Sequence, residues 1–148
     1  MTPEQLSLLY EESDQWWLVR EKIEKFLPYI ASGHTRDVFL LPGGKHVLKY
    51  PIGPAGIKAN IQEAELSKEF PDVIARSRMF GVSAIQIALN DVQFKRVENE
   101  DFDTEERLLL MRAKHIFQGK RRAWADGVFL QYGIDSRGRK RIYDINSY

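Results

Sequence analysis

Residues 29–50 read Tyr-Ile-Ala-Ser-Gly-His-Thr-Arg-Asp-Val-Phe-Leu-Leu-Pro-Gly-Gly-Lys-His-Val-Leu-Lys-Tyr, and this stretch decides the fold. Three short apolar runs, each bounded by residues typical of turns, occupy residues 27–31, 37–41 and 46–50. Runs of this length and composition predict β-strands. Because the connections between them are short, we expect consecutive strands to pair as an antiparallel meander.

A helix and two further strands are predicted after the meander. Residues 59–70 carry spaced apolar side chains and are followed by Pro71, which ends the predicted helix. Residues 76–80 and 83–89 are two more apolar runs on either side of Gly81, and they predict another strand pair. The predicted fold class is therefore α+β, with a five-stranded antiparallel sheet and one packed helix.

Helical patterns lie on both sides of this sheet in the sequence. Apolar residues recur at intervals of three and four at Trp16, Val19, Ile23 and Phe26. They predict a helix within an N-terminal extension, residues 1–26. Thr104 is the predicted N-cap of a helix that carries acidic residues in its first turn. Residues 128–132 and 140–145 then predict a β-hairpin.

The composition restricts the class of protein. The chain has 148 residues, 22 Lys and Arg, 21 Asp and Glu, a net charge of +1 and no cysteine. The absence of cysteine excludes disulfides and thiolate metal sites, and it fits a cytoplasmic protein. No apolar run approaches the roughly 20 residues of a membrane span, and the N-terminus lacks a signal-peptide pattern. The near-neutral charge argues against a nucleic-acid partner.

The neutral total conceals an uneven distribution of charge. Residues 98–106 contain six acids and no base, whereas residues 112–141 contain nine bases and two acids. Solvated faces and loops would account for such runs. Alternatively, the basic third binds an anionic partner, such as a phosphate group or an acidic protein surface.

Lys49 lies in the middle of an apolar strand, where an ammonium group is costly to bury alone. A carboxylate or phosphate partner would offset this cost, and the helix that follows offers Glu63. The alternative is an ordinary hairpin with Lys49 near a sheet edge and its ammonium group in solvent.

Residues 29–50 and 62–71 resemble the first three strands and the helix of a protein-kinase-like N-lobe. The resemblance is to the compact, divergent kinase-like proteins of some bacteriophages. It implies that Ser32, Gly33 and His34 form the tip of a nucleotide loop. It also implies that Lys49 is the lysine of the third strand and that Glu63, rather than Glu65, is its acidic partner. ATP and Mg²⁺ are the cofactors that this resemblance implies.

The C-terminal third resembles the same family more loosely. Asp144 stands where the family has its metal-binding aspartate, and it would hold Mg²⁺. In the stretch that corresponds to the catalytic loop, Arg122 falls at the position of the base and Gly127 at that of a metal-binding asparagine. Arginine cannot accept a proton and glycine has no ligand atom, so Asp126 is the nearby residue that could substitute as the catalytic carboxylate.

The resemblance implies a division into three parts. Residues 1–26 form the N-terminal helical extension, residues 27–94 the kinase-like N-lobe, and residues 95–148 a truncated C-lobe of one helix and a β-hairpin. The chain ends four residues after Asp144, so no activation segment is expected.

Three functional hypotheses follow. The first is a kinase-like protein that has lost phosphotransfer and acts by binding a partner protein of host or phage, with nucleotide binding retained or lost. The second is an active minimal ATP-dependent kinase that uses Lys49, Glu63, Asp126 and Asp144. The third is a non-kinase α+β inhibitor or interaction module. The altered catalytic loop favours the first hypothesis and a protein that is not an enzyme.

Overall fold

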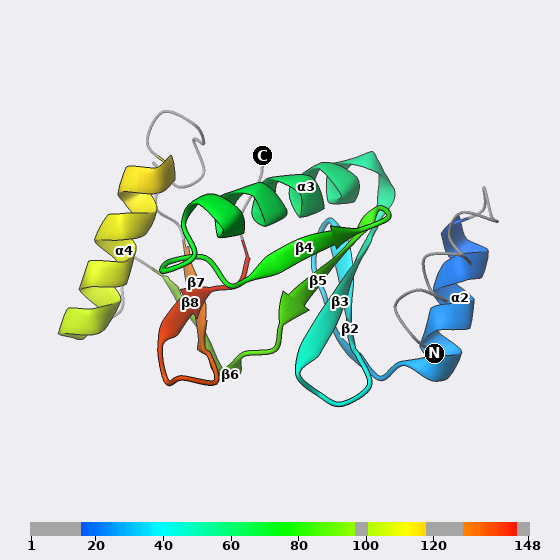
Figure 1. Cartoon of the computed structure of the whole chain (residues 1–148), viewed down its shortest axis with the longest axis horizontal. Coiled ribbons are helices and arrows are strands. Elements are labelled where there is room, and N and C mark those ends of the chain that lie inside the picture. The colour runs from blue at the N-terminus through cyan, green and yellow to red at the C-terminus, as the bar shows by residue number, and fades with distance from the viewer. Residues whose placement is uncertain (1–15, 97–100, 118–128, 145–148) are drawn as a thin grey trace. The chain divides into compact units, whose positions relative to one another are not determined.

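The computed structural model describes residues 16–96, 101–117 and 129–144, and it confirms the α+β fold class (Figure 1). These residues form two compact units. The first consists of the described residues up to Lys68 together with Arg76–Ala88, and the second of Glu69–Ala75 and the described residues from Leu89 onward. The units are therefore interleaved along the chain, whereas the predicted division has boundaries after residues 26 and 94.

The first unit contains two helices and five strands among its described residues. They are α2 (Trp16–Phe26), β1 (Tyr29–Ser32), β2 (Arg36–Leu40), β3 (His46–Pro51), α3 (Gly53–Glu69), β4 (Ser77–Phe80) and β5 (Ser83–Ile87). The strands form one antiparallel sheet in the order β1-β2-β3-β5-β4. The predicted five-stranded antiparallel sheet with a helix between its third and fourth strands is confirmed.

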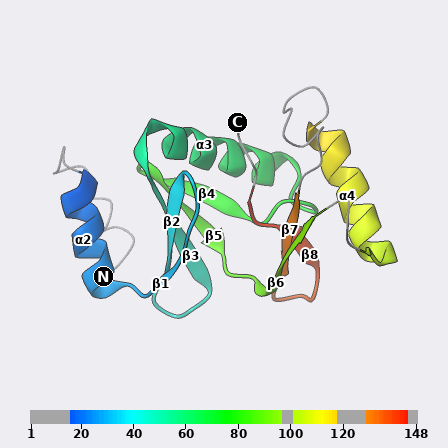
Figure 2. The ribbon, with the colours of Figure 1, turned by 180° about the vertical axis from the view of Figure 1, so that it is seen from behind.

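Helix α3 runs along the sheet, and α2 stands to one side of the strands (Figure 2). Phe39 on β2 pairs with Leu48 on β3, and these side chains share one face with Ile85 on β5. Ile23 and Leu27, at the end of α2, complete an apolar core on that face. The alternate positions of the same strands point toward α3, so the register assigns one apolar and one more polar face to the sheet.

Helix α3 begins six residues earlier than the sequence predicts. The two prolines and two glycines of residues 51–56 predict a loop, but from Gly53 onward the chain forms the first turns of the helix. Pro54 is compatible with a helix start because its missing N–H is not needed there. Gly56 is required at its position because a Cβ would collide with the carbonyl oxygen of Thr35 and with Pro51.

The second unit is built on a three-stranded antiparallel sheet in the order β6-β7-β8. Its elements are β6 (Asn90–Arg96), α4 (Thr104–Phe117), β7 (Phe129–Ile134) and β8 (Lys140–Ile142). Strand β6 adds a third strand to the predicted hairpin of β7 and β8. A β-bulge between Asn90 and Gln93, with Asp91 at φ +48°, interrupts the alternation by which a strand is recognised in sequence.

The short segment Val73–Ala75 runs parallel to β8. The N–H of Ala75 donates to the carbonyl of Ile142 at 2.8 Å, and the N–H of Ile142 donates to the carbonyl of Val73 at 2.9 Å. This pairing explains why residues just after α3 belong to the second unit. No helix among the described residues is long and apolar enough to cross a membrane.

Candidate functional site

Four buried polar residues lie between α3 and the five-stranded sheet: Arg36, Lys49, Asn60 and Glu63. We call them the α3 cluster. Arg36 comes from β2 and Lys49 from β3, on the sheet face that α3 covers. Asn60 and Glu63 are three residues apart on α3, so they project from the same side of the helix. The cluster therefore joins three elements of the first unit.

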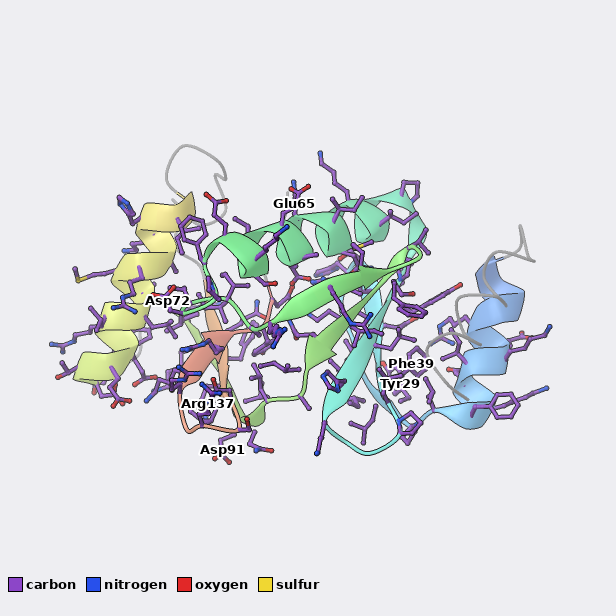
Figure 3. The ribbon with its side chains drawn as sticks, in the orientation of Figure 1. Tyr29, Phe39, Glu65, Asp72, Asp91 and Arg137 are labelled. Carbon is purple, nitrogen blue, oxygen red and sulfur yellow. The ribbon has the colours of Figure 1, made fainter. Side chains whose placement is uncertain are left out.

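Lys49 and Glu63 form a buried ion pair. The Nζ of Lys49 lies 3.2 Å from Oε1 and 3.4 Å from Oε2 of Glu63. Lys49 is 4% exposed and Glu63 is 1% exposed. Glu65, the alternative partner weighed from the sequence, is exposed on the outer side of α3 (Figure 3). The strand lysine thus meets the carboxylate that the sequence analysis favoured.

Arg36 is a second cation on the same carboxylate. One guanidinium nitrogen donates to Oε1 of Glu63 at 3.0 Å, and the other pairs with Oε2 and donates to the side-chain carbonyl of Asn60 at 3.2 Å. Arg36 is 5% exposed. The planar fork of an arginine suits this two-point binding of a carboxylate better than a lysine ammonium does.

Sequence reasoning missed Arg36, because it assigned this residue to the turn before β2. The sequence holds part of the signal, since Arg36, Val38 and Leu40 alternate along a strand. Their partners across the sheet are Pro51, Lys49 and Val47, and this register places Arg36 on the same face as Lys49. Two buried cations on one face call for a nearby carboxylate, but the register itself is known only from the structure.

Asn60 connects α3 to the sheet backbone. Its Nδ2 donates to the carbonyl of Lys49 at 3.1 Å and to the carbonyl of Val82, in the turn between β4 and β5, at 2.9 Å. Two helical turns further on, the hydroxyl of Ser67 donates to the carbonyl of Ser77 and accepts from its N–H, both at 3.0 Å. Helix α3 is therefore fixed by directional bonds in its middle and near its end.

The predicted nucleotide loop is a tight turn between β1 and β2. Ser32 donates from its hydroxyl to Oδ1 of Asp37 at 2.6 Å, and the N–H of Gly33 donates to the carbonyl of Arg36 at 2.8 Å. Arg20 on α2 binds the same Asp37 carboxylate at 2.6 Å, and this hydrogen bond raises the pKa of Arg20. His34 is exposed. The Ser32 hydroxyl and the Gly33 N–H thus serve the hairpin itself.

The remaining predicted site residues, Asp144 and Asp126, come from the C-terminal third of the chain. Asp144 is half-buried two residues after β8 and belongs to the second unit. Asp126, together with Arg122 and Gly127, lies outside the described residues. Within the described ranges, no three acidic or histidine side chains gather as a metal site would require. The structure brings together Lys49 and Glu63 of the predicted set.

A second buried polar group centres on Glu106 of α4. One of its carboxylate oxygens accepts from the hydroxyl of Tyr132 at 2.8 Å and lies 2.7 Å from the Nζ of Lys95. The other accepts from the N–H of Asp103 at 3.0 Å, and Asp103 accepts in return from the N–H of Glu106 at 2.8 Å. This reciprocal pair is a capping box, so the helix is capped by Asp103 and the prediction of Thr104 was wrong.

The ionisation of Glu106 and Tyr132 reflects these contacts. Burial alone would raise the pKa of Glu106, but the bonds from Lys95, the Asp103 backbone and Tyr132 outweigh it and lower the pKa to about 2. Burial and the hydrogen bond to Glu106 raise the pKa of Tyr132. At neutral pH Glu106 is therefore a charged anchor of α4 on its sheet, and neither it nor Tyr132 has a pKa matched to proton transfer at that pH.

No protein-family model, curated protein or solved structure matches this chain.

Proposed function

We propose that this chain is a kinase-like protein that does not transfer phosphate and that acts by binding a partner protein. The observation that carries the proposal is the set of contacts around Lys49 and the burial of its side chain. A lysine on the third strand contacts a glutamate on the following helix, as the resemblance implies, but Arg36 shares the same carboxylate and all three side chains are buried.

The arrangement favours a structural use of the pair over a catalytic one. Phosphotransfer depends on cations that neutralise charge on a bound nucleotide and on a base or positioned acceptor. An active kinase also has this lysine–glutamate pair. The difference here is that Lys49 is only 4% exposed and that Arg36 shares the Glu63 carboxylate within the α3 cluster. The turn that would cover the phosphates uses the Ser32 hydroxyl and the Gly33 N–H internally. At the expected position of the base, the sequence has Arg122.

The role in partner binding is supported by apolar side chains that the described units leave exposed. Those in the second unit are Val92, Phe94, Leu108 and Met111. Where exposed apolar side chains adjoin one another, they mark surfaces that bind other macromolecules.

The test combines a capture assay with an assay of phosphate transfer. Tagged wild-type protein and the Lys49→Met variant are incubated with host lysate, and both are expected to retain the same co-purifying protein. The same two proteins are incubated with γ-labelled ATP and Mg²⁺, and neither is expected to release or transfer label. Loss of capture in a Lys49→Met variant that stays folded by circular dichroism, or transfer of label by the wild type, would refute the proposal.

A further inference from the structure

Helix α4 has two different faces. Its buried face carries Glu106, Leu109, Ala113 and Ile116, at the intervals of three and four residues expected of one side of a helix. This face packs on the three-stranded sheet, where Glu106 bonds to Tyr132. The side of α4 that faces solvent should accordingly be polar.

That outer side instead exposes two long apolar side chains. Leu108 is 49% exposed and Met111 is 66% exposed, and they are three residues apart, so they adjoin each other on the helix surface. Methionine is common at surfaces that accommodate a partner because its flexible side chain adapts to different shapes. We call Leu108 and Met111 the α4 stripe.

The α4 stripe has a basic border. Arg107 and Lys114 are exposed on one side of it, and Arg112 lies on the other. Of the two acids in the first turn of α4, Glu106 is buried. Glu105 is exposed and precedes Leu108 by three residues, but its carboxylate is paired with Lys140 on β8. Arg112 makes an exposed pair with Asp72 at 3.4 Å, which contributes little because both groups remain in solvent.

We propose that the α4 stripe binds an acidic amphipathic helix of a partner protein. The apolar groups of that helix would cover Leu108 and Met111, and its carboxylates would lie against Arg107, Lys114 and Arg112. This inference rests on the proposed role in partner binding and names the surface and the chemistry of the partner.

Two other occupants fit the charges less well. A second copy of the chain would place one basic border against another, and like charges across an interface are unfavourable. An anionic membrane would satisfy the cations, but among its described side chains α4 exposes only two large apolar ones, Leu108 and Met111. Both occupants can be distinguished experimentally from an acidic helix.

The test uses the full chain and a synthetic helical peptide with leucines at positions i, i+3, i+4 and i+7 and glutamates on either side. Fluorescence anisotropy is expected to show binding that weakens as salt is raised. The Leu108→Glu and Met111→Glu variants are each expected to weaken it at least about tenfold. The matched control is Ile61→Glu, an exposed apolar residue on α3 in the other unit, which should leave binding unchanged.

Several outcomes would overturn the inference. They are no binding, equal binding of a scrambled peptide, or equal binding by the Met111→Glu variant with its circular dichroism spectrum intact. If light scattering shows a dimer that the Met111→Glu substitution abolishes, the α4 stripe binds a second copy of the chain. Sedimentation with phosphatidylglycerol vesicles that depends on Leu108 would assign it to a membrane.

Different results would refute the inference about the α4 stripe and the proposed function. Partner capture from lysate that persists in the Met111→Glu variant would remove the α4 stripe and leave the proposed function standing. Transfer of labelled phosphate by the wild type would remove the proposed function, whatever the peptide does.

Discussion

The carboxylate of Glu63 is bonded by Lys49 and Arg36 at a position that is 1% exposed. Burial of an ion pair is costly in itself, but removal of one partner is costlier because it leaves the other charge buried without compensation. Each charged side chain of the α3 cluster therefore depends on the others for compensation of its charge. The residues of the cluster specify how α3 sits on the sheet more than they add net stability.

Replacement of Glu63 should be the most damaging single change in the cluster. The Glu63→Gln variant keeps the shape of the side chain but leaves two buried cations facing a neutral amide. We expect the free energy of unfolding to fall by about 3–5 kcal/mol, measured by urea denaturation. The control is Glu65→Gln on the outer side of the same helix, which should change it by less than about 0.5 kcal/mol. Similar losses in both variants would contradict this account of the cluster.

Glu106 predicts a dependence of stability on pH. Its pKa falls from the ordinary value of 4.5 to about 2 in the folded protein, so the unfolded chain binds its proton more readily. The stabilisation is complete above about pH 5 and is lost as the pH falls toward 2. By linkage it amounts to about 3 kcal/mol.

Urea titrations at pH 6, 4 and 2.5 would measure this stabilisation. In the Glu106→Gln variant, whose side chain does not titrate, the decline between pH 6 and pH 2.5 should be smaller by most of that amount, because the folded-state pKa of about 2 lies just below the lowest pH measured. If the variant and the wild type declined in parallel, Glu106 would not be the group responsible.

At the scale of elements, α3 is fixed at three places along its length. Gly56 contacts the turn before β2, the α3 cluster holds the middle, and Ser67 bonds to both polar backbone groups of Ser77. Its low apolar content on the buried side follows from this mode of attachment. Directional bonds and close backbone approach replace part of the hydrophobic packing that usually holds a helix on a sheet.

Gly56 and Gly33 form a matched pair for testing this attachment. An alanine at Gly56 would drive its Cβ into the Thr35 carbonyl and Pro51, whereas at Gly33 the nearest atom to a new Cβ is the Arg36 carbonyl oxygen at 3.8 Å. We expect Gly56→Ala to lower the free energy of unfolding by about 1–3 kcal/mol and Gly33→Ala to have little effect. Equal melting temperatures for the two variants would show that α3 does not approach the turn this closely.

The sequence predicts the elements of the first unit well because each one is marked by residues that are close together in the chain. Apolar runs between turn residues mark β1 to β3, and the cost of burying Lys49 points to a carboxylate on the next helix. Other features depend on contacts between distant segments. Arg36 becomes important only once β2 and α3 are packed together, and β6 becomes a strand only by pairing with β7 across a bulge.

The N-cap of α4 shows the same limit of sequence-based prediction within a few neighbouring residues. Both Asp103 and Thr104 can cap a helix, and the choice depends on which side chain meets the N–H three residues later. Glu106 settles the choice because its side chain also bonds back to the N–H of Asp103. The capping-box spacing of Asp103 and Glu106 was present in the sequence, but it competed with an equally plausible start one residue later.

At the scale of the whole molecule, a buried lysine–glutamate pair in one unit coexists with exposed apolar side chains in the other. A protein that used Lys49 for chemistry would need it to contact a nucleotide. A protein that uses its surface for binding needs only that the pair keep α3 in place. The two uses make different demands on Lys49, and this residue is where they can be separated.

Nucleotide binding gives an expectation for the intact chain. If Lys49 serves the fold, millimolar ATP with Mg²⁺ should leave the melting temperature of the wild type within about 1 °C of its value without ligand, since a stabilising ligand must bind the folded state. Differential scanning fluorimetry measures this directly, with ADP and buffer as controls. A shift of several degrees that disappears in the Lys49→Met variant would show that the lysine contacts nucleotide.

The central claim is that this chain does not transfer phosphate. The most direct measurement incubates the purified chain with γ-labelled ATP and Mg²⁺ and follows the release or transfer of labelled phosphate. The Lys49→Met variant is measured in the same way. The account predicts that both proteins remain at the level of the blank without protein. Release or transfer by the wild type that is lost in the Lys49→Met variant, while that variant stays folded, would contradict it.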